Sequence, residues 1–157
     1  MLHIRNLEKG FTLLELIVSL SLMVALALLT SSLGGTWIQT ANVTRAQGVL
    51  QRAYSMTKNT ALANSAAKSS IEAAAILCFN SSELKVFSGE SCNRGVLIWQ
   101  SALPSGVTIT LGGTTPSCLA LTNMGALVST TNAGNCVTSV NYSITAGLAN
   151  VTNKILY

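Results

Sequence analysis

The chain has few groups that could carry out chemistry. Among 157 residues it has no aspartate and a single histidine, His3, so all five of its acidic residues are glutamates. A Ser or Cys nucleophile would lack its usual general base, and paired carboxylates would be hard to assemble. Nor does a glycine-rich phosphate loop lead from a strand into a helix. We therefore expect no catalytic residues, no enzyme activity and no cofactor.

Proline and charge are both scarce near the start of the chain. The first hundred residues contain no proline, and no charged residue lies between Glu15 and Arg45. Residues 11 to about 30 are almost wholly apolar, and about 20 apolar residues can span a bilayer as a helix. Arg5 and Lys9 precede this run and would hold the N-terminus in the cytoplasm. The pattern predicts a single membrane-spanning helix, with the rest of the chain outside.

Helical periodicity continues past the apolar run. One face of the predicted helix would carry mainly apolar and small residues: Val43, Leu50, Tyr54, Thr57 and Ala61. The opposite face would carry the polar residues Arg45, Arg52 and Asn59. We predict one helix from about residue 11 to 65, with its weakest point at Gly34 and Gly35. The second half has a single apolar stripe and needs a sheet to cover it.

From about residue 70 the composition changes to short apolar runs separated by turn residues. The predicted strands cover residues 75–80, 84–87, 96–100, 107–111, 119–122, 127–129, 137–145 and 151–156. Strands grouped after one helix indicate an α+β fold, with an antiparallel sheet packed on the helical stripe.

All four cysteines lie beyond the apolar run, at Cys78, Cys92, Cys118 and Cys136. An even number of cysteines outside the cytoplasm favours disulfide bonds, whereas a zinc site would need closer spacing or histidine ligands. We expect two disulfides and no metal. Four cysteines allow three connectivities, and the sequential one, Cys78–Cys92 with Cys118–Cys136, closes the shortest loops.

The junction at the start of the apolar run resembles a known processing signal. The segment consists of Gly10, Phe11 and the following Thr-Leu-Leu-Glu, which ends at Glu15. It resembles the class III signal of type IV prepilins and type II secretion pseudopilins. The resemblance implies a pilin fold, cleavage after Gly10 by a prepilin peptidase, and N-methylation of Phe11. It also implies that Glu15 neutralises the Phe11 amine of a neighbouring subunit during assembly.

This resemblance divides the chain into three parts. Residues 1–10 would be a leader, residues 11–38 the transmembrane and assembly half of the helix, and residues 39–157 a globular pilin domain. The implied partners are other pilin or pseudopilin subunits, the peptidase, an inner-membrane assembly platform and, before assembly, membrane lipid. The protein would reside in the bacterial inner membrane and then in a periplasmic or cell-surface fibre.

The chain departs from major pilins at two positions. Ser32 stands where those proteins often have a helix-breaking proline, and Val24 where they often have a glycine. Later segments, including Gly95 before an apolar strand, are similar to the FimT–GspH group of minor pilins and pseudopilins, although Thr60 and Cys92 differ from the group's usual acid and Trp. These features favour a minor pilin that helps to initiate or cap a type IV pilus, in adhesion, twitching motility or DNA uptake.

Other functions share most of these residues. The chain is equally similar to a minor pseudopilin of a type II secretion system, and a major pilin or an adhesive tip pilin are further alternatives. A DNA-binding tip pilin is disfavoured by charge: the processed chain would keep seven Lys and Arg against four Glu, and those cations are dispersed. Tracking a phosphate backbone requires clustered cations, often with aromatic residues.

Overall fold

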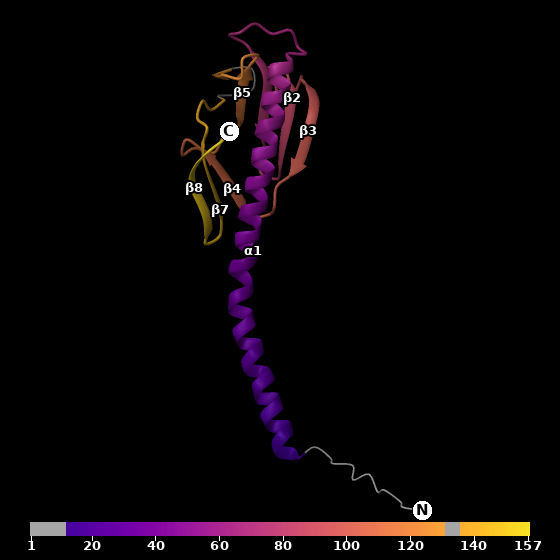
Figure 1. Cartoon of the computed structure of the whole chain (residues 1–157), viewed down its shortest axis with the longest axis vertical. Helices are drawn as coiled ribbons and strands as arrows, with labels where there is room; N and C mark the ends of the chain where they lie inside the picture. Colours follow the sequence, from indigo (N-terminus) through magenta and orange to yellow (C-terminus); the bar gives the residue numbers. More distant parts are fainter. Residues whose placement is uncertain (1–11, 131–135) are drawn as a thin grey trace, which may run out of the picture. The chain divides into compact units, whose positions relative to one another are not determined.

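The computed structural model describes residues 12–130 and 136–157, and within the helix the side chains of residues 29–34 are not described. One helix precedes eight strands in this part of the chain (Figure 1). The helix, α1, spans Leu13–Ala63, and the strands are β1 (Ala73–Phe79), β2 (Glu83–Ser88), β3 (Val96–Ala102), β4 (Val107–Leu111), β5 (Cys118–Thr122), β6 (Leu127–Val128), β7 (Asn141–Ala146) and β8 (Ala149–Ile155). The predicted α+β class is confirmed.

The helix contributes to both of the compact parts into which the chain divides, Met1–Trp37 and Ile38–Tyr157. Its 51 residues include Gly34 and Gly35, and the backbone stays helical through both. The long helix predicted over residues 11–65 therefore matches the observed helix closely in extent.

One feature of the predicted fold is wrong: the first half of the helix does not qualify as a membrane span. Within residues 12–130 and 136–157, no helix is long and apolar enough to cross a membrane. The described part of this half contains Glu15, Ser19 and Ser21 among its apolar residues. A bilayer core requires about 20 predominantly apolar residues. The transmembrane half expected over residues 11–38 is corrected accordingly.

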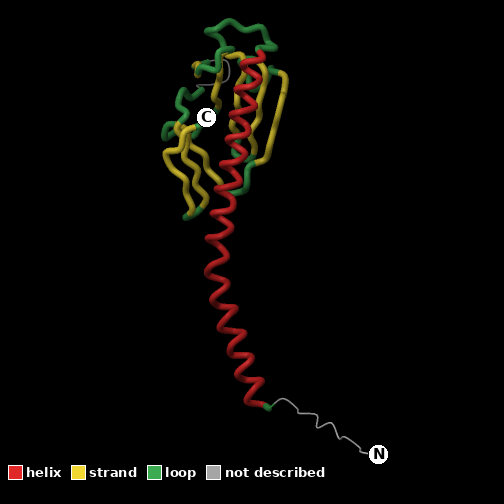
Figure 2. The backbone as a smooth tube through the Cα atoms, in the orientation of Figure 1, coloured by secondary structure: helices red, strands yellow, loops and turns green. Residues whose placement is uncertain are grey.

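The strands form two antiparallel sheets rather than one (Figure 2). The larger sheet has the order β3-β2-β1-β5-β6, and the smaller has the order β4-β7-β8. Strands next to each other in sequence pair in β1–β2, β2–β3, β5–β6 and β7–β8, whereas β1–β5 and β4–β7 are long-range pairings. The predicted strand over residues 137–145 begins only at Asn141.

The second half of α1 buries the predicted stripe in one core with both sheets. Val43, Leu50, Tyr54, Thr57 and Ala61 are all buried, while the residues predicted for the opposite face, Arg45, Arg52 and Asn59, are exposed. Leu77, Leu84 and Leu119 come from the larger sheet, and Ile109, Tyr142 and Ile144 from the smaller. Burying one such large apolar side chain contributes about 1.5–3 kcal/mol, so this core dominates the stability of the domain.

The larger sheet has a second, smaller core on its other face. Strand β1 is buried on both faces, and its residues Ile76 and Cys78 pack with Cys118, Ala120 and Cys136 on the side away from the main core. Such a two-sided strand reads as a continuous apolar run instead of an alternating one, as Ala73–Phe79 does. Segments linked by the two disulfides cover this face of the sheet.

The turn of the β7–β8 hairpin makes a hydrogen bond with Gln39 of the helix. The backbone amide of Leu148 donates a hydrogen bond to Gln39 Oε1 over 3.0 Å. Gly147 has a φ of 58°, and a Cβ added there would lie 2.5–2.8 Å from three side-chain atoms of Gln39. Glycine at this position therefore permits both the left-handed turn and the close approach of the hairpin to α1.

Candidate functional site

Glu15 lies in the first turn of α1 and belongs to a reciprocal cap. Its Oε2 accepts hydrogen bonds from the backbone amide and the hydroxyl of Thr12, both at 3.2 Å, and its own amide donates to Thr12 Oγ1 at 3.3 Å. This is the capping-box arrangement, in which a Thr and a Glu three residues later satisfy each other's backbone donors. A carboxylate is also stabilised by the positive end of the helix dipole.

The helix beyond Glu15 presents apolar side chains in every direction. Leu16, Ile17, Leu20 and Leu22 are each more than half exposed. The same holds for the larger side chains that follow, Met23, Val24, Leu26 and Leu28. Such a run is too large for the isolated apolar residues of an ordinary surface, and contiguous patches of this kind mark interaction sites.

Two of the residues predicted to form the processing site cannot be placed. Gly10 and Phe11 lie outside the described residues, as does the leader of residues 1–10. Glu15 is the one predicted assembly residue with described contacts.

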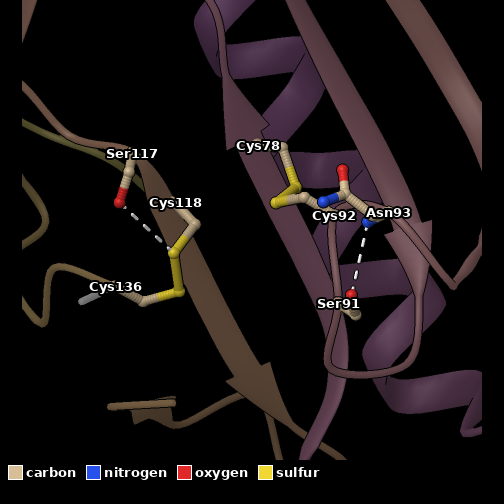
Figure 3. The surroundings of a disulfide bond; sticks show 7 residues. All are labelled: Cys78, Ser91, Cys92, Asn93, Ser117, Cys118 and Cys136. Carbon is tan, nitrogen blue, oxygen red and sulfur yellow. Dashed lines mark hydrogen bonds between the residues drawn. A yellow bond between two sulfur atoms is a disulfide. The ribbon is translucent and has the colours of Figure 1, made fainter. Parts of the chain in front are cut away.

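The four cysteines form two disulfides, Cys78–Cys92 and Cys118–Cys136, the sequential connectivity expected from loop length (Figure 3). The first joins β1 to the loop after β2, with a Cα–Cα distance of 5.9 Å. The second joins β5 to the segment before β7, with a Cα–Cα distance of 4.5 Å. Both disulfides lie at the smaller core of the larger sheet. They are therefore part of the domain, and none of their cysteines is near Glu15 in the sequence.

A polar network at the end of α1 was not predicted from the sequence. Asn64 has a φ of 44°. Its side chain binds both backbone polar groups of Lys68: Oδ1 accepts a hydrogen bond from the Lys68 amide at 2.8 Å, and Nδ2 donates one to the Lys68 carbonyl at 2.9 Å. Asn123 Nδ2 donates to the same carbonyl at 3.1 Å. Asparagine often adopts the left-handed conformation just past the C-terminus of a helix. Asn64 was therefore the residue from which the sequence could have predicted this end of the helix.

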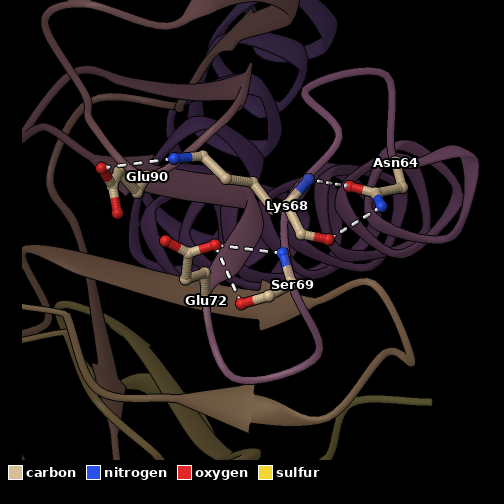
Figure 4. Close-up of polar contacts among 5 residues, drawn as sticks. All are labelled: Asn64, Lys68, Ser69, Glu72 and Glu90. Atoms are coloured by element: carbon tan, nitrogen blue, oxygen red, sulfur yellow. Dashed lines mark hydrogen bonds and ion pairs between the residues drawn. The ribbon is translucent and has the colours of Figure 1, made fainter.

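The same loop contains a second carboxylate cap (Figure 4). Glu72 Oε2 accepts hydrogen bonds from the amide and the hydroxyl of Ser69, at 3.0 and 2.9 Å. These bonds, the backbone one first, and the nearby charge of Lys68 hold the pKa of Glu72 below its usual value. Lys68 Nζ lies 3.5 Å from Glu90 Oε1. Ser69 and Glu72 thus repeat the local pattern of Thr12 and Glu15.

The described residues offer no metal centre. Across residues 12–130 and 136–157, no group of three or more His, Cys, Asp or Glu side chains could hold a metal ion. All four cysteines form disulfides, so none has a free thiol to bind a metal. A comparison of the chain with protein-family models, with curated proteins and with solved structures found no match in any of the three.

Proposed function

We propose that this protein is a minor subunit of a type IV pilus or a closely related fibre, which acts by docking and not by catalysis. The observation that carries the proposal is Glu15 at the head of a helix whose following side chains are apolar and exposed on all sides. The processing signal at Gly10 and Phe11 supports it from the sequence. The protein would act outside the cytoplasm, in the periplasm or in a cell-surface fibre.

Exposed apolar side chains on the first half of α1 need a cover that the chain itself does not provide among its described residues. Leu14 is 74% exposed, whereas Leu50 in the second half of the same helix is fully buried. Burying such a side chain gains about 1.5–3 kcal/mol, so nine or more of them provide a large driving force for association. Like helices of neighbouring subunits offer a matching apolar surface, and their packing would form the core of the fibre.

Glu15 would set the register between subunits. Its Oε2 is held by Thr12, and this leaves Oε1 for a cation supplied by a neighbour. After cleavage at Gly10, the amine of Phe11 on the neighbouring subunit is such a cation. A carboxylate left unpaired inside an apolar bundle is costly, so only the register that pairs Glu15 with the amine is stable. The domain, residues 38–157, would supply lateral contacts.

Replacing Glu15 tests this role, and the chain offers a matched control. Both Glu15→Gln and Glu72→Gln lose a carboxylate that accepts from a Thr or Ser three residues earlier. We expect Glu15→Gln to be processed and folded but absent from sheared fibres, and Glu72→Gln to be incorporated like the wild type. Quantitative immunoblotting of the fibre fraction and of whole cells measures this. Equal incorporation of the two variants would refute an assembly role for Glu15.

A minor pseudopilin of a type II secretion system is the second candidate, because it uses the same processing signal and helix. The two functions differ in the phenotype of a deletion strain. Loss of pili with intact protein secretion supports the pilus subunit, and loss of secretion with intact pili supports the pseudopilin. Mass spectrometry of the mature N-terminus is common to both, and an unprocessed Met1 terminus would contradict both.

A further inference from the structure

We propose that a cleft beside the end of β2 binds a compact oxyanion, a phosphate or a carboxylate group, through Arg94 and Lys68. The cleft has a volume of about 660 Å³ and is lined by Lys68 and by residues of the 88–95 segment. We call it the Arg94 cleft. The inference does not depend on the proposed fibre function, because it rests on residues of the domain alone.

The 88–95 wall of the Arg94 cleft is a tightly constrained loop. Cys92 is bonded to Cys78 of β1, which fixes the middle of the loop to the sheet. Gly89 has a φ of 100°. At Gly95 an added Cβ would lie 2.6 Å from the Ser88 carbonyl oxygen and 3.0 Å from that of Ser91. The loop therefore closes back on itself in one conformation, and Arg94 projects from a fixed base.

The opposite wall holds Lys68, whose backbone is fixed on both sides. Asn64 bonds the amide and the carbonyl of Lys68, and Asn123 bonds the carbonyl a second time. Ala67, directly before it, has a φ of 48°, which is uncommon for a residue with a side chain. A cation on so well supported a backbone loses less conformational entropy when a ligand binds, and preorganisation of this kind favours binding.

The charges in the Arg94 cleft leave room for an anion. Arg94 is exposed and, among the residues that the structure describes, makes no hydrogen bond or ion pair. Lys68 pairs with Glu90, but at 3.5 Å this contact is longer than the 2.7–2.9 Å of a good charge-assisted hydrogen bond. Two cations and one carboxylate line the cleft, a surplus of one positive charge. Glu72 lies near Lys68 as well, with one carboxylate oxygen held by Ser69, but it does not line the cleft.

The geometry of the guanidinium favours a group with two oxygens on one side. Arg presents its donors in a planar fork that matches carboxylate and phosphate oxygens, whereas Lys acts as a single point charge. In the Arg94 cleft, Arg94 would therefore orient the oxyanion and Lys68 would add attraction. Glu90 would compete with the ligand for Lys68, and its removal should strengthen binding.

The test is a titration of the oxidised full-length chain in detergent with inorganic phosphate and, separately, with acetate. Chemical shifts of the Gly89 and Gly95 amides report binding. We expect Arg94→Gln to weaken phosphate binding about tenfold, as for a lost hydrogen bond to a charged group, and Glu90→Gln to tighten it about threefold, since exposed ion pairs are weak. Lys154→Gln, outside the cleft, is the control and should change nothing.

The opposite signs of the two variants make the proposal easy to overturn. Equal binding by Arg94→Gln and the wild type would refute it, as would weaker binding by Glu90→Gln or no amide shifts with either anion. Preference for phosphate over acetate would assign a phosphate source to the ligand, and the reverse preference a carboxylate source. Retention of the two disulfides in each variant, measured by mass, shows that a change in binding is not due to misfolding.

Discussion

The two halves of α1 both contain many apolar residues but have opposite surroundings. In the first half, Leu14, Leu20 and Leu28 are 74, 56 and 69% exposed, whereas in the second half Val43 and Leu50 are 3 and 0% exposed. The second half has a polar face to turn outward, marked by Arg45 and Arg52, and the first has none after Glu15. A helix with a single apolar stripe can be satisfied by its own domain, whereas one that is apolar all round needs several partners.

Among the described residues, this difference confines the contribution of α1 to the domain core to its second half. The core formed by the second half contains residues of both sheets, so its loss would unfold the domain. Among the described residues, none of the large apolar side chains of the first half is buried in either core. Mutations in the second half should therefore lower the free energy of unfolding of the domain, whereas mutations in the first half should leave it nearly unchanged.

The largest expected effect comes from paired leucine truncations. Leu50→Ala should lower the free energy of unfolding by about 4 kcal/mol, because a fully buried Leu loses its contacts and leaves a cavity. Leu20→Ala, at a residue 56% exposed, should change it by less than about 0.5 kcal/mol. Urea denaturation of the full chain in detergent measures both. If Leu20→Ala were as destabilising as Leu50→Ala, the separation of the two halves would fail.

Removal of a disulfide is expected to have the next largest effect, confined to the domain. The double variant Cys118→Ser with Cys136→Ser should lose about 3 kcal/mol, the value for a closed loop of roughly 15 residues. The separation of these cysteines is 18, against 14 for Cys78 and Cys92, so the matching double variant there should lose a similar amount. The same urea denaturation, with oxidised wild type as reference, measures it. A loss of helicity in residues 13–28 of either variant would contradict confinement to the domain.

The smallest expected effect concerns acid stability and the cap at Ser69. The pKa of Glu72 is lowered in the folded protein, chiefly by the Ser69 amide, from an ordinary value of 4.5. Its contribution to stability is therefore complete above about pH 4.5 and is lost as the pH falls through the lower folded-state pKa. Glu72→Gln should flatten the pH dependence of the urea midpoint below pH 4.5 and slightly lower the midpoint at neutral pH, where the wild-type carboxylate contributes fully. A wild-type midpoint independent of pH in this range would contradict the lowered pKa.

Local periodicity was sufficient to predict most elements. The stripe from Val43 to Ala61 has helical spacing, and all five predicted members are buried. Each predicted strand run overlaps an observed strand. What periodicity did not reveal is the division into two sheets, because it depends on long-range pairing of β1 with β5 and of β4 with β7. Nothing local in the sequence encodes those partners.

The errors arose where tertiary contacts override local pattern. The run after Val137 looks like a strand, but the Val137 amide bonds to the Cys118 carbonyl at 2.9 Å and the neighbouring Cys136 is linked to Cys118. The segment before Asn141 is therefore tied to β5 at its start, before it reaches the smaller sheet at Val140, whose carbonyl accepts from the Leu156 amide at 3.0 Å. The polar network around Lys68 was missed for a similar reason, because Asn64 and Asn123 are 59 residues apart and meet only in the fold.

The two disulfides also bear on the order in which the chain matures. Each joins a cysteine to the next one along the chain, over 14 and 18 residues. A chain whose domain is exported into an oxidising compartment in sequence order presents Cys78 and Cys92 before Cys118 appears, so pairing by first availability would yield the native bridges. Neither bridge involves α1. Oxidation can thus be completed without waiting for the helix to dock, and it requires no later reshuffling of mispaired thiols.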